Sequence, residues 1–373
     1  MNRPGFDDPG QAQRYGDFLC GIWASACDVF DLPAGHAARI TGELRRLLPS
    51  WADDEIGDSP SFRSYVAGDG FPAELSVNWS GHRPELRVLF DCLPDARSGY
   101  HHTPADHSGT AELRAASPRF REIDRHFTLA AGRPSAAPLW HSIAWRPPAQ
   151  PAHKTYFGLF EWPIPYRYAA VADAMEQLGM AAAWEHARRW IERDGGRPWE
   201  IEFVGLDLAS ASDARVKIYY RNHDADIHEL NRIASVARTH DANDALAAFR
   251  TLTGGQDDAG EAALTCLAFR SGLERVAEAT TYLRLPSLAS SDQESVDRTA
   301  ALLDQVHRDA RPLRTFAAAL APVRLDDSRG FLELVSYRAA HQRGDITTYF
   351  RFPVFERLAA AESVASVASA DLV

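Results

Sequence analysis

The sequence lacks several features that would assign it to a common class. Its four cysteines show no CxxC spacing, which predicts reduced thiols rather than a zinc site or a disulfide framework. No apolar run reaches the roughly 18 residues that a transmembrane helix needs, and residues Met1–Asp8 have no signal-peptide core. Walker, GxGxxG and GxSxG motifs are also absent. We therefore expect a cytoplasmic protein without these nucleotide-binding or serine-nucleophile sites.

The sequence contains fewer basic than acidic residues. Lys and Arg number 40 against 51 Asp and Glu, and the net charge of −11 argues against a nucleic-acid or anionic-membrane partner. A chain of 373 residues with 45% hydrophobic residues can bury a large core. Because no linker or composition break divides it, we expect one domain over residues 1–373. N-terminal helices would occupy residues 1–70, repeated units about 71–356, and a tail 357–373.

Cations that do occur are arranged on predicted strands. Within Arg215–Arg221 one strand face carries Arg215, Lys217 and Tyr219, because successive side chains of a strand point to opposite sides. The opposite face is apolar, as a core-facing surface would be. Other predicted strands repeat the combination of a cation with tyrosine or apolar neighbours. The residues are Arg87, Lys154 with Tyr156, Tyr282 with Arg284, and Tyr349 with Arg351.

Each of these strands is the second of a predicted hairpin, and the hairpins recur about every 60–67 residues. The first strands are predicted at Glu74–Trp79, Leu139–Trp145, Glu200–Leu208, Leu264–Arg270 and Phe331–Arg338. Helical stretches precede the hairpins, which gives five ααββ units. Ten antiparallel strands avoid unpaired edges by closing into a barrel with an outer ring of helices, an α+β fold. The rival is an open antiparallel sheet, which does not explain why every second strand carries a cation opposite apolar residues.

A closed barrel would bring the cations into one lumen. They repel one another, and few acids lie on the same strand faces, so an anionic ligand such as a diphosphate would suit them. The expected cations are Arg87, Lys154, Arg215, Lys217, Arg284 and Arg343. Aromatic rings stabilise a nearby cation by roughly 0.5–2 kcal/mol each. The expected rings are Tyr156, Tyr219, Tyr282, Tyr337 and Tyr349. Together these groups are suited to ionising an allylic diphosphate.

The patterns Lys154-x-Tyr156 and Arg215-x-Lys217-x-Tyr219, with the five-fold ααββ period, resemble the dimethylallyltryptophan synthase family of aromatic prenyltransferases. The resemblance covers roughly Glu74–Glu356 and is nearer to the bacterial indole prenyltransferases than to the longer fungal enzymes. It implies the ABBA or PT barrel with an active site in the lumen. It also implies transfer of a dimethylallyl group from dimethylallyl diphosphate to the indole of L-tryptophan, in secondary metabolism.

The resemblance implies further roles for single residues. Glu74 would accept a hydrogen bond from the indole N–H, and Arg343, six residues after Tyr337, would contact the diphosphate. His141 stands where fungal relatives have a lysine proposed as the base, so it could take the ring proton; it could equally be a core or rim histidine. Gly158 replaces a further tyrosine of many relatives, which would widen the pocket.

The sequence has no DDxxD-type aspartate motif, so we expect no Mg²⁺ cluster and no cofactor besides the prenyl donor. The expected partners are small molecules only, and the chain would be a monomer or homodimer. An indole dipeptide or a phenolic or hydroxynaphthalene ring remains an alternative acceptor. A barrel carrier of an anionic ligand is the alternative without catalysis. The position of attachment on the ring, normal or reverse, is not predicted.

Overall fold

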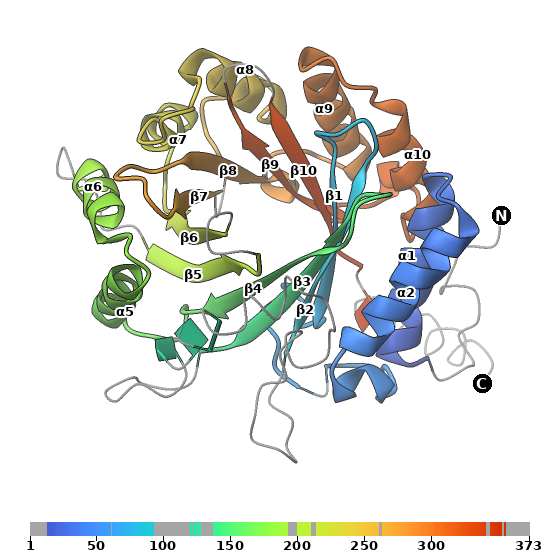
Figure 1. The fold of residues 1–373 in the computed structure, drawn as a ribbon. Helices are drawn as coiled ribbons and strands as arrows, with labels where there is room; N and C mark the ends of the chain where they lie inside the picture. Colours follow the sequence, from blue (N-terminus) through green and yellow to red (C-terminus); the bar gives the residue numbers. More distant parts are fainter. Residues whose placement is uncertain are drawn as a thin grey trace, which may run out of the picture.

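The computed structural model describes residues 13–92, 120–127, 137–192, 200–209, 214–260, 263–340, 344–352 and 354–355, except 61, 122 and 125. Ten strands form one closed antiparallel barrel, in the order β1-β10-β9-β8-β7-β6-β5-β4-β3-β2 (Figure 1). The pairing of β1 with β10 closes the sheet, which excludes the open-sheet alternative. The predicted barrel of five hairpins is therefore confirmed.

The strands alternate with the turns and helices that the sequence predicts. Their bounds are β1 Ala73–Asn78, β2 Glu85–Asp91, β3 Leu139–Trp145, β4 Ala152–Gly158, β5 Glu200–Asp207, β6 Arg215–Asn222, β7 Ala263–Arg270, β8 Glu278–Arg284, β9 Leu332–Arg338 and β10 Asp345–Phe350. Two second strands, predicted from Tyr282 and Tyr349 onward, begin further upstream. β8 also ends at Arg284, because Pro286 lies in the following 3₁₀ helix η2, Leu285–Ser287, and proline cannot donate to a strand ladder.

Helices cover the outside of the barrel in pairs (Figure 1). Their bounds are α1 Tyr15–Val29, α2 Ala34–Leu47, α5 Ile164–Gln177, α6 Ala181–Ile191, α7 Ile227–Ala234, α8 Ala242–Leu252, α9 Asp292–Gln305 and α10 Arg311–Leu320, with 3₁₀ helices η1 Ser50–Asp53 and η3 Leu325–Asp327. In the part of the chain that the structure describes, none of the helices has the length and apolar character needed to span a membrane.

Side-chain caps fix where several helices begin. Asp226 accepts a hydrogen bond from the backbone N–H of Glu229 at the start of α7, and Ser291 accepts one from Glu294 at the start of α9. The buried carboxylate of Asp292 accepts three more, from the backbone N–H groups of Gly330, Phe331 and Leu332 at 3.0–3.2 Å. This contact attaches α9 to the start of β9 and so fixes the position of one wall of the barrel.

The two faces of each strand differ in chemistry. Outer residues such as Ile218 and Tyr220 on β6 are fully buried against the helices. Inner residues of the same strand, Lys217 and Tyr219, face the lumen instead, because the side-chain period of a strand is two. The closed sheet thus separates an apolar shell from a polar, aromatic interior.

Candidate active site in the barrel lumen

The lumen contains a cavity of about 550 Å³, within the 300–1,000 Å³ typical of ligand pockets. Its lining comes from the inner faces of nearly all the strands and from the segment before β1. Its polar and aromatic lining includes Tyr65, Glu74, Ser76, Arg87, Trp140, Ser142, Lys154, Tyr156, Phe160, Glu202, Phe203, Tyr219, Arg221, Tyr282, Arg284 and Tyr349.

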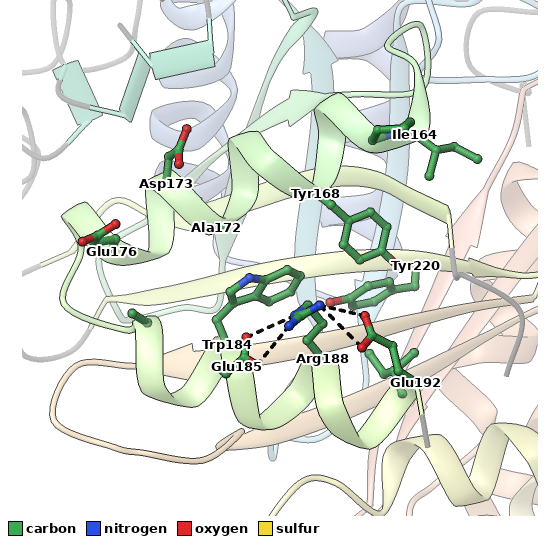
Figure 2. A pocket seen from close by; sticks show the side chains of 13 residues that line it. Ile164, Tyr168, Ala172, Asp173, Glu176, Trp184, Glu185, Arg188, Glu192 and Tyr220 are labelled. Atoms are coloured by element: carbon green, nitrogen blue, oxygen red, sulfur yellow. Dashed lines mark hydrogen bonds and ion pairs between the residues drawn. The ribbon is translucent and has the colours of Figure 1, made fainter. Parts of the chain in front are cut away.

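A larger hollow, of about 780 Å³, lies outside the barrel between α5 and α6 (Figure 2). Its one arginine, Arg188, is engaged by Glu185 at 3.0 Å and Glu192 at 3.1 Å on the same helix. Trp184 and Tyr220 in its wall are buried as part of the packing of α6 on the barrel. The hollow therefore lacks the convergence of unpaired polar groups that the lumen has, and the lumen is the candidate site.

Both lysines of the chain face this lumen. Lys154 on β4 is only 9% exposed, and its Nζ has no ion-pair partner among the described residues. The Nζ of Lys217 on β6 lies 4.0 Å from Asp207 Oδ1. Burial, the charge of Lys217 and that of Arg87 hold the pKa of Lys154 well below its usual value. Every other Lys or Arg position of the chain is arginine, which stays charged. The two lysine side chains, whose amines can lose a proton, therefore lie together in the lumen.

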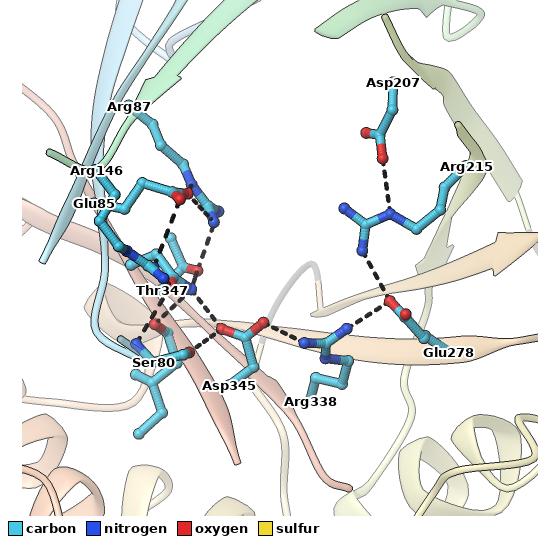
Figure 3. Close-up of polar contacts among 12 residues, drawn as sticks. Ser80, Glu85, Arg87, Arg146, Asp207, Arg215, Glu278, Arg338, Asp345 and Thr347 are labelled. Atoms are coloured by element: carbon cyan, nitrogen blue, oxygen red, sulfur yellow. Dashed lines mark hydrogen bonds and ion pairs between the residues drawn. The ribbon is translucent and has the colours of Figure 1, made fainter. Parts of the chain in front are cut away.

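Arg87 and Arg215 flank the two lysines, but they are not unpaired. Arg87 Nε donates to Glu85 at 2.6 Å. Arg215 donates to Asp207 at 2.7 Å and to Glu278 at 2.9 Å (Figure 3). The expectation that few acids share these strand faces is thus wrong. The sequence does contain a signal for these acids. Glu85 lies two residues before Arg87, and Glu278 lies four residues before Tyr282, so each acid falls on the same strand face as a predicted site residue.

These pairs keep the carboxylates ionised despite their burial. Burial alone would raise the pKa of Asp207, but the charges of Lys217 and Arg215 outweigh it and hold that pKa well below its usual value. The same opposition between burial and arginine charge lowers the pKa of Glu85 and of Glu278. The hairpin-turn end of the lumen is therefore a region of fixed, alternating charge.

Next along the barrel lies a continuous belt of tyrosines. The ring centroids of Tyr156 and Tyr219 are 6.1 Å apart, those of Tyr219 and Tyr282 5.9 Å, and those of Tyr282 and Tyr349 5.7 Å. Burial raises the pKa of all four phenols, so they remain neutral. Four of the five predicted tyrosines are thus adjacent to one another around the lumen.

The belt extends through aromatic residues that the sequence interpretation missed. Phe203 stacks on Tyr219 with centroids 4.1 Å apart, and Trp140 contacts Phe203 at 5.5 Å. Opposite Tyr156, Gly205 leaves room for the ring, since a Cβ there would lie 3.0 Å from it. Strand alternation would have placed Phe203 and Trp140 inward, but neither is next to a cation in the sequence.

Beyond the belt, Glu74 of β1 faces the cavity among paired charges. Burial raises the pKa of its carboxyl to about 8, although the nearby Arg284 acts to lower it. At neutral pH this carboxyl is therefore mostly protonated. Arg284 itself forms an ion pair with Glu333, and Arg221 forms one with Glu202. The two ends of the lumen thus differ: lysines and arginines at one, a neutral carboxyl between ion pairs at the other.

Three predicted residues are not where the sequence interpretation placed them. Arg284 lies on the Glu74 side of the belt, and the charges that act most strongly on it are Arg221 and Glu202 rather than the lysines. His141 points outward, since its neighbours Trp140 and Ser142 line the cavity. Its ring is 1% exposed and packs on Phe90 and Phe120. The expectation that it faces the reacting ring is therefore corrected.

Tyr337 also points outward, where its hydroxyl donates to Asp244 of α8 at 2.6 Å. On this strand Leu334 lines the cavity, and Ser336, on the same face, hydrogen-bonds with Tyr349. Both errors, at His141 and Tyr337, have one cause: a shift of one residue along a strand exchanges its faces. Arg343 lies outside the described residues. Among the residues described, no group of three or more His, Cys, Asp or Glu is placed to hold a metal ion.

The two lysines provide a direct test of the electrostatics of the lumen. In protein labelled with ¹³Cε-lysine, both side chains should titrate below the usual value of about 10.4, Lys154 further than Lys217. NMR spectra recorded over a pH series would measure this, with Lys154→Met and Lys217→Met variants assigning the two signals. Titration of both lysines at the usual value would contradict the description of the site.

The fold and the site can be compared with known proteins. No protein-family model matches the chain. The 6-dimethylallyltryptophan synthase of Micromonospora olivasterospora, crystallised with DMASPP and Trp, is 25% identical, covers 92% of this chain and 98% of its own, and has a TM-score of 0.79. The 5-dimethylallyltryptophan synthase of Streptomyces coelicolor, also with DMASPP and Trp, is 23% identical over 92% and 97%, with a TM-score of 0.75.

A third solved structure, the prenyltransferase PriB with L-tryptophan and dimethylallyl thiolodiphosphate, is 23% identical over 92% of this chain and 97% of its own, with a TM-score of 0.76. All three match nearly the whole length of both chains, so the likeness concerns the complete barrel. The chain therefore has the PT-barrel fold of the bacterial dimethylallyltryptophan synthases, the family that its sequence resembles.

Proposed function

We propose that the protein transfers a dimethylallyl group from dimethylallyl diphosphate to the indole ring of L-tryptophan and releases diphosphate. The observation that carries this proposal is the order of groups along the lumen: buried lysines and arginines, then a belt of neutral tyrosines, then the carboxyl of Glu74. An allylic diphosphate and an indole require these three environments in this order. Structural neighbours that bind tryptophan and a dimethylallyl donor analogue support the assignment.

The diphosphate would bind to Lys154, Lys217, Arg87 and Arg215. Among the described residues no carboxylate forms an ion pair with Lys154, although the charge of Asp207 acts on it, and the Nη2 atom of Arg215 has no hydrogen-bond partner there. Hydrogen bonds to charged groups contribute roughly 1.5–3 kcal/mol each, and here they would stabilise the leaving group as its charge develops. We propose that they take the place of a metal ion, and that the enzyme acts in the cytoplasm.

The dimethylallyl cation would form next to the tyrosine belt. The faces of Tyr156, Tyr219, Tyr282 and Tyr349 stabilise positive charge and occupy the space from which water could otherwise attack. The indole attacks the cation from the Glu74 side, with its N–H donating to the carboxylate. Loss of the ring proton then restores aromaticity; His141, on the outer face of β3, is not placed to accept it.

Removal of a diphosphate ligand tests this assignment. Lys217→Ala and Arg215→Ala should each reduce turnover by a factor of 100 or more, on the order of the loss of one preorganised oxyanion donor. Release of pyrophosphate in the presence of tryptophan and dimethylallyl diphosphate, with mass detection of the product, measures it. The control is Arg314→Ala, which breaks a surface ion pair with Asp297 on α9.

Full activity in both lumen variants would refute the diphosphate site. Binding without pyrophosphate release in the wild type would instead favour the carrier alternative.

Glu74 predicts a pH dependence with a definite sign. Its pKa of about 8 means that the accepting carboxylate form increases as the pH rises through 8. The value of kcat/KM for tryptophan should therefore rise over this range, since this parameter reports groups of the free enzyme. Glu74→Gln should lower the rate by orders of magnitude and abolish this inflection. If the variant keeps both the rate and the inflection, Glu74 does not hold the indole.

A further inference from the structure

The end of the lumen opposite the hairpin turns is covered by the segment before β1, residues 62–71, which we call the strap. It leads into β1 just ahead of Glu74, and its Arg63 and Tyr65 line the lumen cavity. The strap is therefore part of the cavity wall on the Glu74 side of the tyrosine belt.

Contacts on both sides of Tyr65 hold the strap to the barrel. Ser64 donates a hydrogen bond at 2.8 Å to Oδ2 of Asp91, the last residue of β2. Farther along the strap, Asp69 lies 3.6 Å from the Nε atom of Arg351, which directly follows β10. These contacts fix the backbone around Tyr65 and so determine where its ring lies.

Tyr65 reaches from the strap to the loop between β4 and α5. Its ring packs on that of Phe160 with centroids 4.4 Å apart, and its hydroxyl donates to Glu161. Arg63 contacts the same carboxylate at 3.2 Å and lies 4.5 Å above the Tyr65 ring. We call Arg63, Tyr65, Phe160 and Glu161 the mouth clasp, because they join the strap to this loop across the cavity wall.

The mouth clasp lies at the boundary between the cavity and solvent. On its inner side Phe160 stacks on Trp140, with centroids 5.7 Å apart, and Trp140 is 4% exposed and contacts Phe203 beside the tyrosine belt. On its outer side the Arg63 side chain is 75% exposed. A column of aromatic rings thus leads from the belt toward the surface, where Tyr65 is half-buried.

From this geometry we infer that Tyr65, held by the mouth clasp, is a specificity-determining residue whose ring limits the acceptor to the size of a free amino acid. The inference rests on the proposed function. When the indole N–H reaches Glu74 and the ring faces the belt, the rest of the acceptor is left the space between the belt and the mouth clasp. Tyr65 and Phe160 bound this space. A second residue, joined by a peptide bond, would have to displace the Tyr65 ring.

Two contacts resist this displacement. The hydrogen bond from Tyr65 to Glu161 is assisted by charge, and the Tyr65 ring gains a further favourable contact with Phe160. Because the strap is attached at Ser64 and Asp69, the ring cannot withdraw without breaking both. Since the outer side of the clasp is open to water, removal of the ring would open a passage to solvent.

The test is Tyr65→Ala, with kcat/KM measured for L-tryptophan and for the dipeptide tryptophylglycine at saturating dimethylallyl diphosphate. In the wild type the dipeptide should be poorer by about 100-fold or more, and in Tyr65→Ala by about tenfold or less, because its glycine can then project into water. The value for tryptophan should fall less than about fivefold, since the contacts at Glu74 and the belt remain. An unchanged ratio of the two acceptors would overturn the inference.

Two further variants examine the mouth clasp. Phe160→Ala removes the other ring of the pair, so it should relax the ratio in the same direction, and it decides the question if Tyr65→Ala does not fold. Tyr65→Phe keeps the ring but loses the contact with Glu161, so its ratio should lie between those of the wild type and Tyr65→Ala. A wild-type ratio in both Phe160→Ala and Tyr65→Phe would refute the role of the clasp.

The chain provides a matched control in Tyr166→Ala. Tyr166 follows the same loop near the start of α5, is 47% exposed and does not line the lumen cavity. Loss of its ring should leave the ratio of the two acceptors unchanged. A change as large as that in Tyr65→Ala would show that loss of any surface ring at this end suffices, and would overturn the inference.

Binding separates the inference from the proposed function. Calorimetric titrations with tryptophan and with tryptophylglycine, in the presence of dimethylallyl thiolodiphosphate, need no turnover. Dipeptide binding that is tighter in Tyr65→Ala than in the wild type by about tenfold or more supports the size limit even if no prenylated product forms. Equal affinity of the wild type for both acceptors, alongside normal transferase activity on tryptophan, would refute the size limit and leave the proposed function intact.

Discussion

Ion pairing inside a closed barrel is the constraint on which the rest of the structure depends. Several cations facing one lumen would repel one another at the low effective dielectric of a protein interior, and an unpaired buried charge is strongly destabilising. Here Glu85, Asp207, Glu278 and Asp345 balance the arginines. Lys154 is left to respond to a ligand, and lysine can do so because, unlike arginine, it can lose its proton.

The lumen is consequently polarised along its length. Charges concentrate at the hairpin-turn end, neutral phenols occupy the middle, and the protonated carboxyl of Glu74 lies beyond them among paired charges. Such an arrangement separates the part of a reaction that develops negative charge from the part that develops positive charge. The register of β5 and β6 shows this order directly, with Lys217 opposite Gly205 and Tyr219 opposite Phe203.

Much of this could be predicted from the sequence, because the period of two along Arg215–Arg221 identifies both the core face and the lumen face. The five hairpins and four tyrosines follow from that pattern. Glu278 and Asp345 were missed because β8 and β10 begin before the predicted strands. Asp207 lies inside the predicted strand Glu200–Leu208, but the sequence does not show that it lies beside Arg215. His141 and Tyr337 were placed on the wrong face of their strands, by a shift of one residue. Arg284 was assigned to the wrong end of the lumen, because sequence spacing predicts the face of a strand but not the position of a residue along the axis of a barrel with tilted strands.

A crystal structure of the protein with dimethylallyl thiolodiphosphate and tryptophan would test the central claim most directly. The account predicts the diphosphate among Lys154, Lys217, Arg87 and Arg215, the dimethylallyl group against the tyrosine belt, and the indole N–H on Glu74. A diphosphate bound at Arg221 and Arg284, on the other side of the belt, or outside the barrel altogether, would contradict it.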